Sequence, residues 1–279
     1  MDRLNSYMRF PAAALGVVIV IGAVAVLLAG CALGDDDKAG SLWTAHTLPS
    51  SRYWISVAYG GGTFVAVAEG PSNAAATSPD GVTWTGHTLP SSQYWMSVAY
   101  GGGTFVAVAD GPSNAAATSP DGITWTERTL PSSRSWRSVC YGGGTFVAVA
   151  DGSNVAATSP DGVTWTERTL PGSLQWHSVT YGGDTFVAVA WGGAVAATSP
   201  DGVTWTARTL PGHEMWASVT YGGGTFVVVS SGTVAATSPN GTTWTPRTLP
   251  NDRPWYSVCY GGGAFVAVAY NSSDAATSP

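Results

Sequence analysis

The strongest constraint on the fold is a repeat that runs from Leu42 to the end of the chain. Two tryptophans mark each copy, and they form two series: Trp43, Trp84, Trp125, Trp165, Trp205 and Trp244, then Trp54, Trp95, Trp136, Trp176, Trp216 and Trp255. Successive members of either series are 41, 41, 40, 40 and 39 residues apart. Twelve of the 13 tryptophans therefore belong to the repeat, and Trp191 is the exception.

Each copy contains the signals of four short strands. In the first copy these are WISVAY at 54–59, TFVAVA at 63–68, AAATS at 74–78 and VTWTGHTL at 82–89. Glycines at 60–62 and the SPDG sequence at 78–81 supply the turns. Four strands in about 40 residues are typical of a β-propeller blade. TFVAVA is apolar on both faces, so we expect both faces to be buried between neighbouring blades.

The repeats predict an all-β fold, a six-bladed β-propeller of four-stranded blades over residues 41–279. The segment 41–49 matches the fourth strand of a copy, and the sequence at 275–279 precedes the place where a fourth strand would follow. We therefore expect the N-terminal strand to complete the last blade and to remove the free sheet edges. The alternative is an open β-solenoid.

The first forty residues indicate export. Arg3 and Arg9 precede a run without charges at 11–30, which is typical of a signal peptide. Residues 31–40 contain small and charged side chains that cannot pack, so they are predicted to be a flexible tether. The chain would then have a signal peptide at 1–30, a tether at 31–40 and a propeller at 41–279.

The end of the apolar run, Leu28-Ala29-Gly30-Cys31, resembles the lipobox of bacterial lipoproteins. This resemblance implies that Cys31 carries a lipid that anchors the protein to the bacterial cell membrane or outer membrane. The alternative is an uncleaved transmembrane anchor, since twenty apolar residues can just span a bilayer. Both interpretations place the folded part outside the cytoplasm.

The composition excludes several classes of partner. Charged residues make up 10% of the chain and the formal net charge is −6, so nucleic acid is not an expected partner. The hydrophobic fraction of 44% is too high for a disordered protein. Four histidines show no metal-ligand spacing, and we expect no metal and no cofactor. We expect a monomer.

The sequence SPDGVTW at 78–84, with its near copies, resembles the Asp-box of sialidase-type repeats. The resemblance covers residues 41–279 and extends to bacterial surface propellers, phage tail proteins and propellers that help to assemble membrane complexes. It implies that four aspartates hydrogen-bond within their own turns and are not catalytic: Asp80, Asp121, Asp161 and Asp201.

The sequence predicts no catalytic site, because catalysis needs an asymmetric set of residues and the repeats are nearly identical. The arginines of the RTLP segments occupy one repeated position and do not form a cluster: Arg128, Arg168, Arg208 and Arg247. A non-catalytic binding or scaffolding module is therefore expected. The alternatives are a sialidase-like glycoside hydrolase, and a purely structural, phage-tail-like repeat protein.

The copies differ mainly in two places. One is the loop before the second tryptophan, and the other is the position that directly follows the TFVAVA segment. Strand parity places both at the same end of each blade, opposite the GGG and SPDG turns. Loops on a rigid scaffold often carry binding sites, so this end is predicted to bind a protein or glycan ligand, although surface loops also vary without selection. Its candidate residues are Glu69, Asp110, Asp151, His177, Trp191, His213, Met215, Tyr256 and Tyr270.

Cys140 and Cys259 occupy one repeated position in the third and sixth copies. Those blades would face each other across the ring, farther apart than a disulfide allows. We expect two unpaired, buried thiols.

Overall fold

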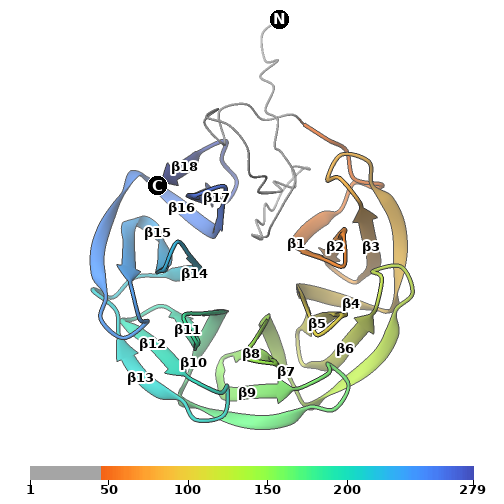
Figure 1. Cartoon of the computed structure of the whole chain (residues 1–279), viewed down its shortest axis with the longest axis horizontal. Coiled ribbons are helices and arrows are strands. Elements are labelled where there is room, and N and C mark those ends of the chain that lie inside the picture. Colours follow the sequence, from red (N-terminus) through yellow and green to blue (C-terminus); the bar gives the residue numbers. More distant parts are fainter. Residues whose placement is uncertain (1–44) are drawn as a thin grey trace, which may run out of the picture.

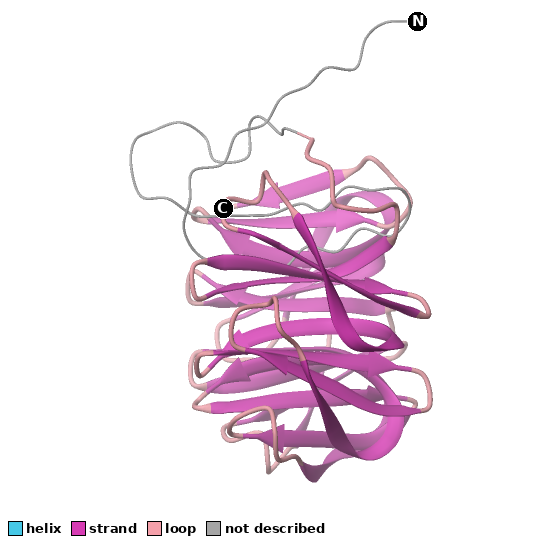
Figure 2. Ribbon diagram, turned by 90° about the vertical axis from the view of Figure 1, so that its right-hand side faces the viewer, coloured by secondary structure: helices cyan, strands magenta, loops and turns pink. Residues whose placement is uncertain are grey.

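The computed structural model describes residues 45–279, in which strands are the only regular elements (Figure 2). The first nine strands are β1 (Tyr53–Gly60), β2 (Thr63–Glu69), β3 (Ser72–Ser78), β4 (Thr85–Gly101), β5 (Thr104–Asp110), β6 (Ser113–Ser119), β7 (Thr126–Gly142), β8 (Thr145–Asp151) and β9 (Ser153–Ser159). The others are β10 (Thr166–Gly182), β11 (Thr185–Trp191), β12 (Val195–Ser199), β13 (Thr206–Thr209), β14 (Trp216–Gly222), β15 (Thr225–Ser238), β16 (Thr245–Gly261), β17 (Ala264–Ala269) and β18 (Ala275–Ser278).

The strands form repeated antiparallel sheets that are joined by long shared strands. Residues 85–88 of β4 pair with β3, and residues 94–101 of the same strand pair with β5. The strand β4 thus forms the outer edge of one sheet and the inner edge of the next, and β7, β10 and β16 do the same. We number the six sheets by their inner strands, which are β1, β14 and the second halves of β4, β7, β10 and β16. Figure 1 shows these sheets around a common centre.

The described strands form an arc whose two ends are β1 and the sheet of β16, β17 and β18 (Figure 1). The first four sheets each contain four paired strand segments. In the fifth, β15 spans the second and third strands of the repeat and pairs with β14 and β16, and the sixth contains three strands in the described part of the chain. The closing strand was expected at 41–49. Residues 41–44 lie outside the described residues, and residues 45–48 are not in a strand. The expected ring closure is therefore not part of the described structure.

Other predictions also fall on the N-terminal segment. The signal peptide, the tether and the lipidation site Cys31 lie outside the described residues. Within residues 45–279, no helix is long and apolar enough to cross a bilayer.

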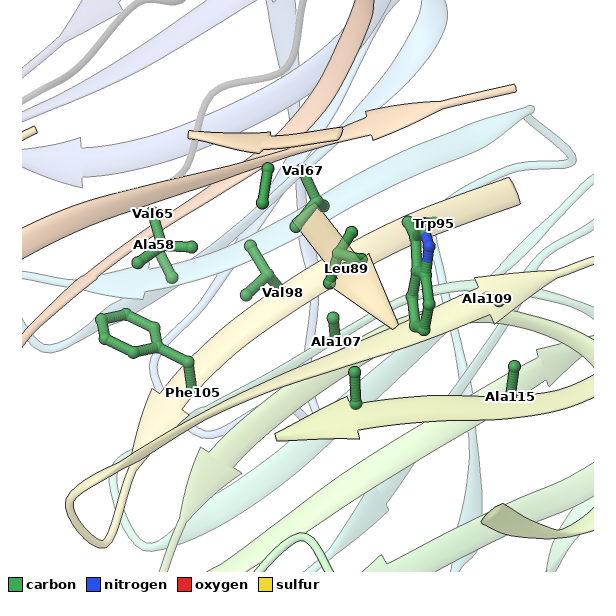
Figure 3. Close-up of a cluster of buried hydrophobic side chains, with 12 residues drawn as sticks. Ala58, Val65, Val67, Leu89, Trp95, Val98, Phe105, Ala107, Ala109 and Ala115 are labelled. Atoms are coloured by element: carbon green, nitrogen blue, oxygen red, sulfur yellow. The ribbon is translucent and has the colours of Figure 1, made fainter. Parts of the chain in front are cut away.

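The core lies between adjacent sheets, as the first pair shows in Figure 3. Val65 and Val67 of β2 belong to one cluster with Trp95 and Phe105 of the second sheet. Residues 65–68 of β2 have no exposed surface. The prediction that TFVAVA is buried on both faces is thus confirmed. The second to fifth sheets have a neighbour on either side, and in the first sheet Ala66 and Ala68 pack with Leu48 and Trp54.

Two repeated contacts hold neighbouring sheets in register. The Ser56 hydroxyl accepts a hydrogen bond from the Val98 amide at 3.1 Å, and the equivalent serines do the same up to the bond from Val258 to Ser218. The glycine that ends each inner strand lies under the tyrosine of the next sheet. A Cβ atom at Gly142 would lie 1.9 Å from Tyr181 Cγ. Only glycine permits this approach.

Each SPDG turn is held by hydrogen bonds between residues of the turn and the two residues that follow it. The Asp161 carboxylate accepts hydrogen bonds from the amides of Val163 and Thr164 at 2.8 and 3.1 Å. The Ser159 hydroxyl donates to the same carboxylate at 3.1 Å and accepts from the Gly162 amide at 2.8 Å. These bonds lower the pKa of Asp161. The aspartates at 80, 121 and 201 bond in the same way, so the hydrogen bonds expected within these turns are present.

Candidate functional site

At one end of the molecule, each inner strand carries a β-bulge directly after its buried tryptophan. In β7 the register shifts between Trp136 and Ser138, which leaves Arg137 without a paired position. A bulge turns a side chain away from the regular alternation of a strand. The six bulge residues, one in each sheet, are Ile55, Met96, Arg137, His177, Ala217 and Tyr256. We call them the bulge ring.

A second set of six residues lies at the same end. Five lie at or next to the end of the second strand of their sheet, and Ser231 is the equivalent residue within β15. Asp151, for example, pairs with Ser135, which comes directly before Trp136. We call this set the exit ring, and its members are Glu69, Asp110, Asp151, Trp191, Ser231 and Tyr270. The strands beneath are nearly identical, so the chemical differences between sheets are concentrated in these two rings.

Arg137 connects four sheets through its guanidinium group. Its Nη1 donates to Asp110 Oδ2 at 2.9 Å, and its Nη2 donates to the Tyr256 hydroxyl at 2.8 Å. The same Nη2 lies 3.2 Å from His177 Nε2. The Arg137 and Asp110 side chains are only 18% and 25% exposed, so this ion pair is shielded from water more than a surface pair is.

His177 is held as a neutral imidazole in one tautomer. Its Nδ1 lies 2.7 Å from the Ala217 carbonyl oxygen, which can only accept a hydrogen bond. The Arg137 guanidinium can only donate, so Nδ1 carries the proton and Nε2 accepts. Burial, and then the positive charge of Arg137, lower the pKa of His177 to about 4. The ring therefore adds no positive charge to the site at neutral pH.

Three carboxylates surround the single guanidinium. Asp110 pairs with Arg137 directly. Burial raises the pKa of Glu69 and of Asp151, and Arg137 offsets this in part. In the described structure, Asp151 Oδ1 is buried and has no hydrogen-bond partner, which is costly for a charged oxygen. The site therefore contains three carboxyl groups and one guanidinium group.

Aromatic rings form the other side of the site. His177 lies 5.0 Å from Trp191 and 5.6 Å from Tyr256, measured between ring centroids. Tyr256 lies 5.9 Å from Tyr270, which is 40% exposed. Met215 forms an isolated bridge with Trp191 and is 49% exposed. Rings whose faces are accessible beside buried neighbours can stack on a ligand.

Most of the predicted binding residues thus lie together. Seven of them are connected, either by interactions with Arg137 or by contacts between aromatic rings. They are Glu69, Asp110, Asp151, His177, Trp191, Tyr256 and Tyr270. Met215 adjoins Trp191. His213 is exposed in the loop between β13 and β14, and none of the interactions described above involves it.

Arg137, which holds the site together, and the Ala217 carbonyl were not among the predicted site residues. A signal was available. Arg137 is the one arginine or lysine at the variable position that follows the second tryptophan. The predicted site residues were the aromatic, acidic, histidine and methionine side chains of this end, without the arginine that connects them.

The repeated arginines lie elsewhere, on the outer strand segments, where Arg168 Nε donates to the Thr158 hydroxyl at 2.9 Å. Arg128, Arg208 and Arg247 make the equivalent bond. Within residues 45–279, no group of three or more histidine, cysteine, aspartate or glutamate side chains is arranged to hold a metal ion.

Both cysteines of the described chain are free. Cys259 is buried, and burial raises its pKa to about 12. Cys140 is partly exposed as a residue, but burial of its thiol raises its pKa, which agrees with the expected buried thiol. It shares this partial exposure with the equivalent inner-strand residues Thr180 and Thr220.

Comparisons with known proteins agree with this architecture. The model of the DUF6242 beta propeller domain family matches residues 88–208, which is 121 of 279 residues. The fold is of the β-propeller type. No curated protein matches the sequence significantly.

Solved structures share this fold at low sequence identity. Virginiamycin B lyase from Staphylococcus aureus is 13% identical, with a TM-score of 0.73 over 81% of this chain and 80% of that chain. YCF48 bound to D1 peptide is 17% identical, with a TM-score of 0.59 over 82% of each chain. The computationally designed Ika8 protein is 13% identical, with a TM-score of 0.61 over 83% of this chain and 72% of that chain. One of these is a lyase and one is bound to a peptide, so the likeness describes the fold and not the activity.

Proposed function

We propose that this protein is a lipid-anchored, extracytoplasmic binding module that engages a protein or glycan ligand through the end formed by the bulge ring and the exit ring. The observation that carries the proposal is the concentration of differences at this end. Six nearly identical sheets carry different side chains there, and Arg137 connects four of those sheets through Asp110, His177 and Tyr256. Binding residues are often found on the connecting segments at one end of a rigid scaffold, and this cluster lies where the copies differ.

The proposed role is non-catalytic. The Arg137 guanidinium is occupied by three partners, and His177 is neutral with both ring nitrogens engaged. Neither group is therefore free to transfer a proton or to stabilise a developing charge. YCF48, which has a similar fold, is described with a bound peptide, and this supports a binding role without assigning a ligand.

We also propose that the ring has six blades and is closed by residues 41–49. Leu48 is buried against Trp54 and Ala66, as the equivalent Leu89 is buried beside Trp95. Trp54 Nε1 donates to the Ser50 carbonyl oxygen at 3.1 Å, and the same bond recurs at Trp95. The segment that enters the first sheet therefore resembles the segment that links one sheet to the next.

Closure can be tested with a pair of cysteines. Ala76 pairs with Gly86 in the first sheet, and the repeat places Ala276 and Ala45 at the equivalent positions. The Ala45→Cys/Ala276→Cys variant should form a disulfide on mild oxidation, whereas Thr47→Cys/Ala276→Cys should not. If both pairs remain reduced, the N-terminal strand does not complete the sixth sheet.

The anchor and the binding end require separate tests. Cys31→Ser should abolish incorporation of a radiolabelled fatty acid by a bacterial host, and unchanged labelling would remove the lipoprotein assignment.

For binding, the full chain in nanodiscs is screened on a glycan array and against purified surface proteins. Trp191→Ala/Tyr270→Ala should abolish the signal.

A matched control lies at the opposite end of the molecule. Ile123 and Val163 follow two SPDG turns and are 51% and 43% exposed. Ile123→Ala/Val163→Ala should leave binding unchanged. If the two double variants bind equally well, or if nothing binds to the unsubstituted protein, the proposed binding end is wrong.

A further inference from the structure

The charges around Arg137 do not balance. Glu69, Asp110 and Asp151 interact electrostatically with one guanidinium. Asp110 is the partner in direct contact with it, at 2.9 Å. Burial disfavours the charged forms of the other two carboxylates. A positive group placed beside them would remove this cost.

Asp151 shows the imbalance at the level of a single atom. Its Oδ1 is buried without a hydrogen-bond partner among the described residues, although buried carboxylate oxygens are normally bonded. The Gly152 amide and Arg137 favour the charged form of Asp151, but burial outweighs them and the pKa is raised. An additional donor with a positive charge would satisfy this oxygen.

The aromatic side of the site suits the same kind of ligand. Trp191 and Tyr270 are exit-ring residues like Glu69 and Asp151, and Tyr256 joins them through its contact with Tyr270. The face of an aromatic ring attracts a cation, and its apolar surface packs against hydrocarbon. Carboxylates and aromatic rings together are the usual surroundings of a cationic group on an apolar stem.

We infer that the ligand is a basic segment of a peptide or protein, whose lysine or arginine side chain lies beside Glu69 and Asp151 while its apolar neighbours pack on Trp191 and Tyr270. This inference rests on the proposed binding function and names the chemistry of its ligand. An acidic ligand fits poorly. The Arg137 guanidinium is already bound to Asp110, His177 and Tyr256, and the remaining acidic groups, Glu69 and Asp151, are carboxyl groups that an anion would not pair with.

The test uses the full chain in phosphatidylcholine nanodiscs and isothermal titration calorimetry at low salt. The probes are a hexapeptide that alternates lysine with leucine, the same peptide with every lysine Nε-acetylated, and a peptide with glutamate in place of lysine. We expect the lysine peptide to bind, and acetylation to weaken binding by about tenfold or more. Empty nanodiscs provide the blank.

Variants assign the effect to named residues. Glu69→Gln/Asp151→Asn should weaken binding of the lysine peptide by about tenfold or more. Glu127→Gln/Glu167→Gln removes the same charge from exposed outer strand segments and should leave affinity unchanged. The inference would be overturned if the first double variant kept its affinity for the lysine peptide, or if both double variants lost affinity equally. A preference for the acetylated or glutamate peptide would also overturn it.

The inference and the proposed function fail in different ways. Suppose that the screens find a ligand whose binding is lost in Trp191→Ala/Tyr270→Ala but is unaffected by Glu69→Gln/Asp151→Asn. The proposed binding end is then supported, and the proposed cationic ligand is refuted. If neither the screens nor the peptides give binding, both are refuted. Binding of the lysine peptide that depends on the aromatic pair and on the acidic pair supports both.

Discussion

The Arg137 guanidinium donates a hydrogen bond of 2.8 Å to the hydroxyl of Tyr256, which lies 119 residues further along the chain. The two residues belong to the third and sixth sheets, so the bond joins distant parts of the arc. Asp110 and His177 bind the same guanidinium from the second and fourth sheets. The cluster is therefore a cross-link between sheets as well as the centre of the proposed binding end.

Replacement of Arg137 should destabilise the fold. In Arg137→Met the Asp110 carboxylate loses its counter-ion, and Tyr256 and His177 lose a hydrogen-bond partner. We expect the free energy of unfolding to fall by about 2–4 kcal/mol, measured by urea denaturation. Arg134→Met is the control, because Arg134 is exposed on the same strand, and it should change stability by less than about 0.5 kcal/mol. Equal effects of the two variants would show that the cross-link contributes nothing.

His177 should make stability depend on pH in a defined window. Its pKa is about 4 in the folded protein and about 6.5 when unfolded. Between these values the unfolded chain binds a proton that the folded protein does not, so stability falls as the pH is lowered from 6.5 to 4. The loss is up to about 3 kcal/mol. The buried neighbours of the ring are Arg137, Asp110, Tyr256 and Trp191.

The measurement is the urea midpoint at pH 7.5, 5.5 and 4.5. His177→Gln should flatten the dependence in this window, and His213→Gln should retain it, because His213 is exposed. A profile that is unchanged in His177→Gln would contradict the assignment of His177 as a buried neutral imidazole.

Gly142 should tolerate no side chain. A Cβ atom there would lie 1.9 Å from Tyr181 Cγ, so Gly142→Ala forces the third and fourth sheets apart and should cost about 3 kcal/mol or more. Gly172→Ala is the control, since its Cβ atom would lie 3.6 Å from Leu174 Cγ. If Gly142→Ala does not fold, Gly142→Ala/Tyr181→Ala should regain the folded circular dichroism spectrum. A double variant that stays unfolded would show that the clash with Tyr181 is not the cause.

The SPDG turns should contribute to acid sensitivity. Asp161→Ala removes the acceptor of two amides and should cost about 1 kcal/mol at pH 7. Asp161→Asn should be almost neutral, because Asn240 already makes the same bonds in the fifth turn, at 3.0 and 3.2 Å. The pKa of Asp161 is lowered, so its stabilising contribution is present above the unfolded pKa of about 3.9 and is lost as the pH falls through the lower folded value.

Urea midpoints from pH 5 to pH 2 test this prediction. Stability of the unsubstituted protein should fall more steeply with acid than that of Asp161→Asn. Parallel profiles would mean that the carboxylate does not titrate differently in the folded and unfolded states.

The sequence predicted the repeating sheets because their signals are local. The alternation of Val65 and Val67 with small alanines indicates a strand buried on both faces, and Asp161 lies within hydrogen-bonding reach of its own turn. Strand parity also placed the variable positions at one end. Each of these inferences needs only neighbouring residues and the two-residue period of a strand.

The site depended on distances that the sequence does not contain. Arg137 was not selected because its partners come from the second, fourth and sixth sheets, and the β-bulge that turns it toward them follows from strand pairing. His213 was selected for its residue type, but it lies exposed in a loop. The predicted closure of the ring involves residues 41–44, which are outside the described part of the chain.

The sequence by itself determined the all-β repeat, the position of its turns and the end at which the copies differ, because periodicity and turn chemistry act over a few residues. Only the tertiary structure decided that Arg137 shares its charge with Asp110, His177 and Tyr256 and that Asp151 keeps an unsatisfied oxygen. Electrostatic interactions depend on distance through space and on burial. Both are set when the sheets pack around a common centre.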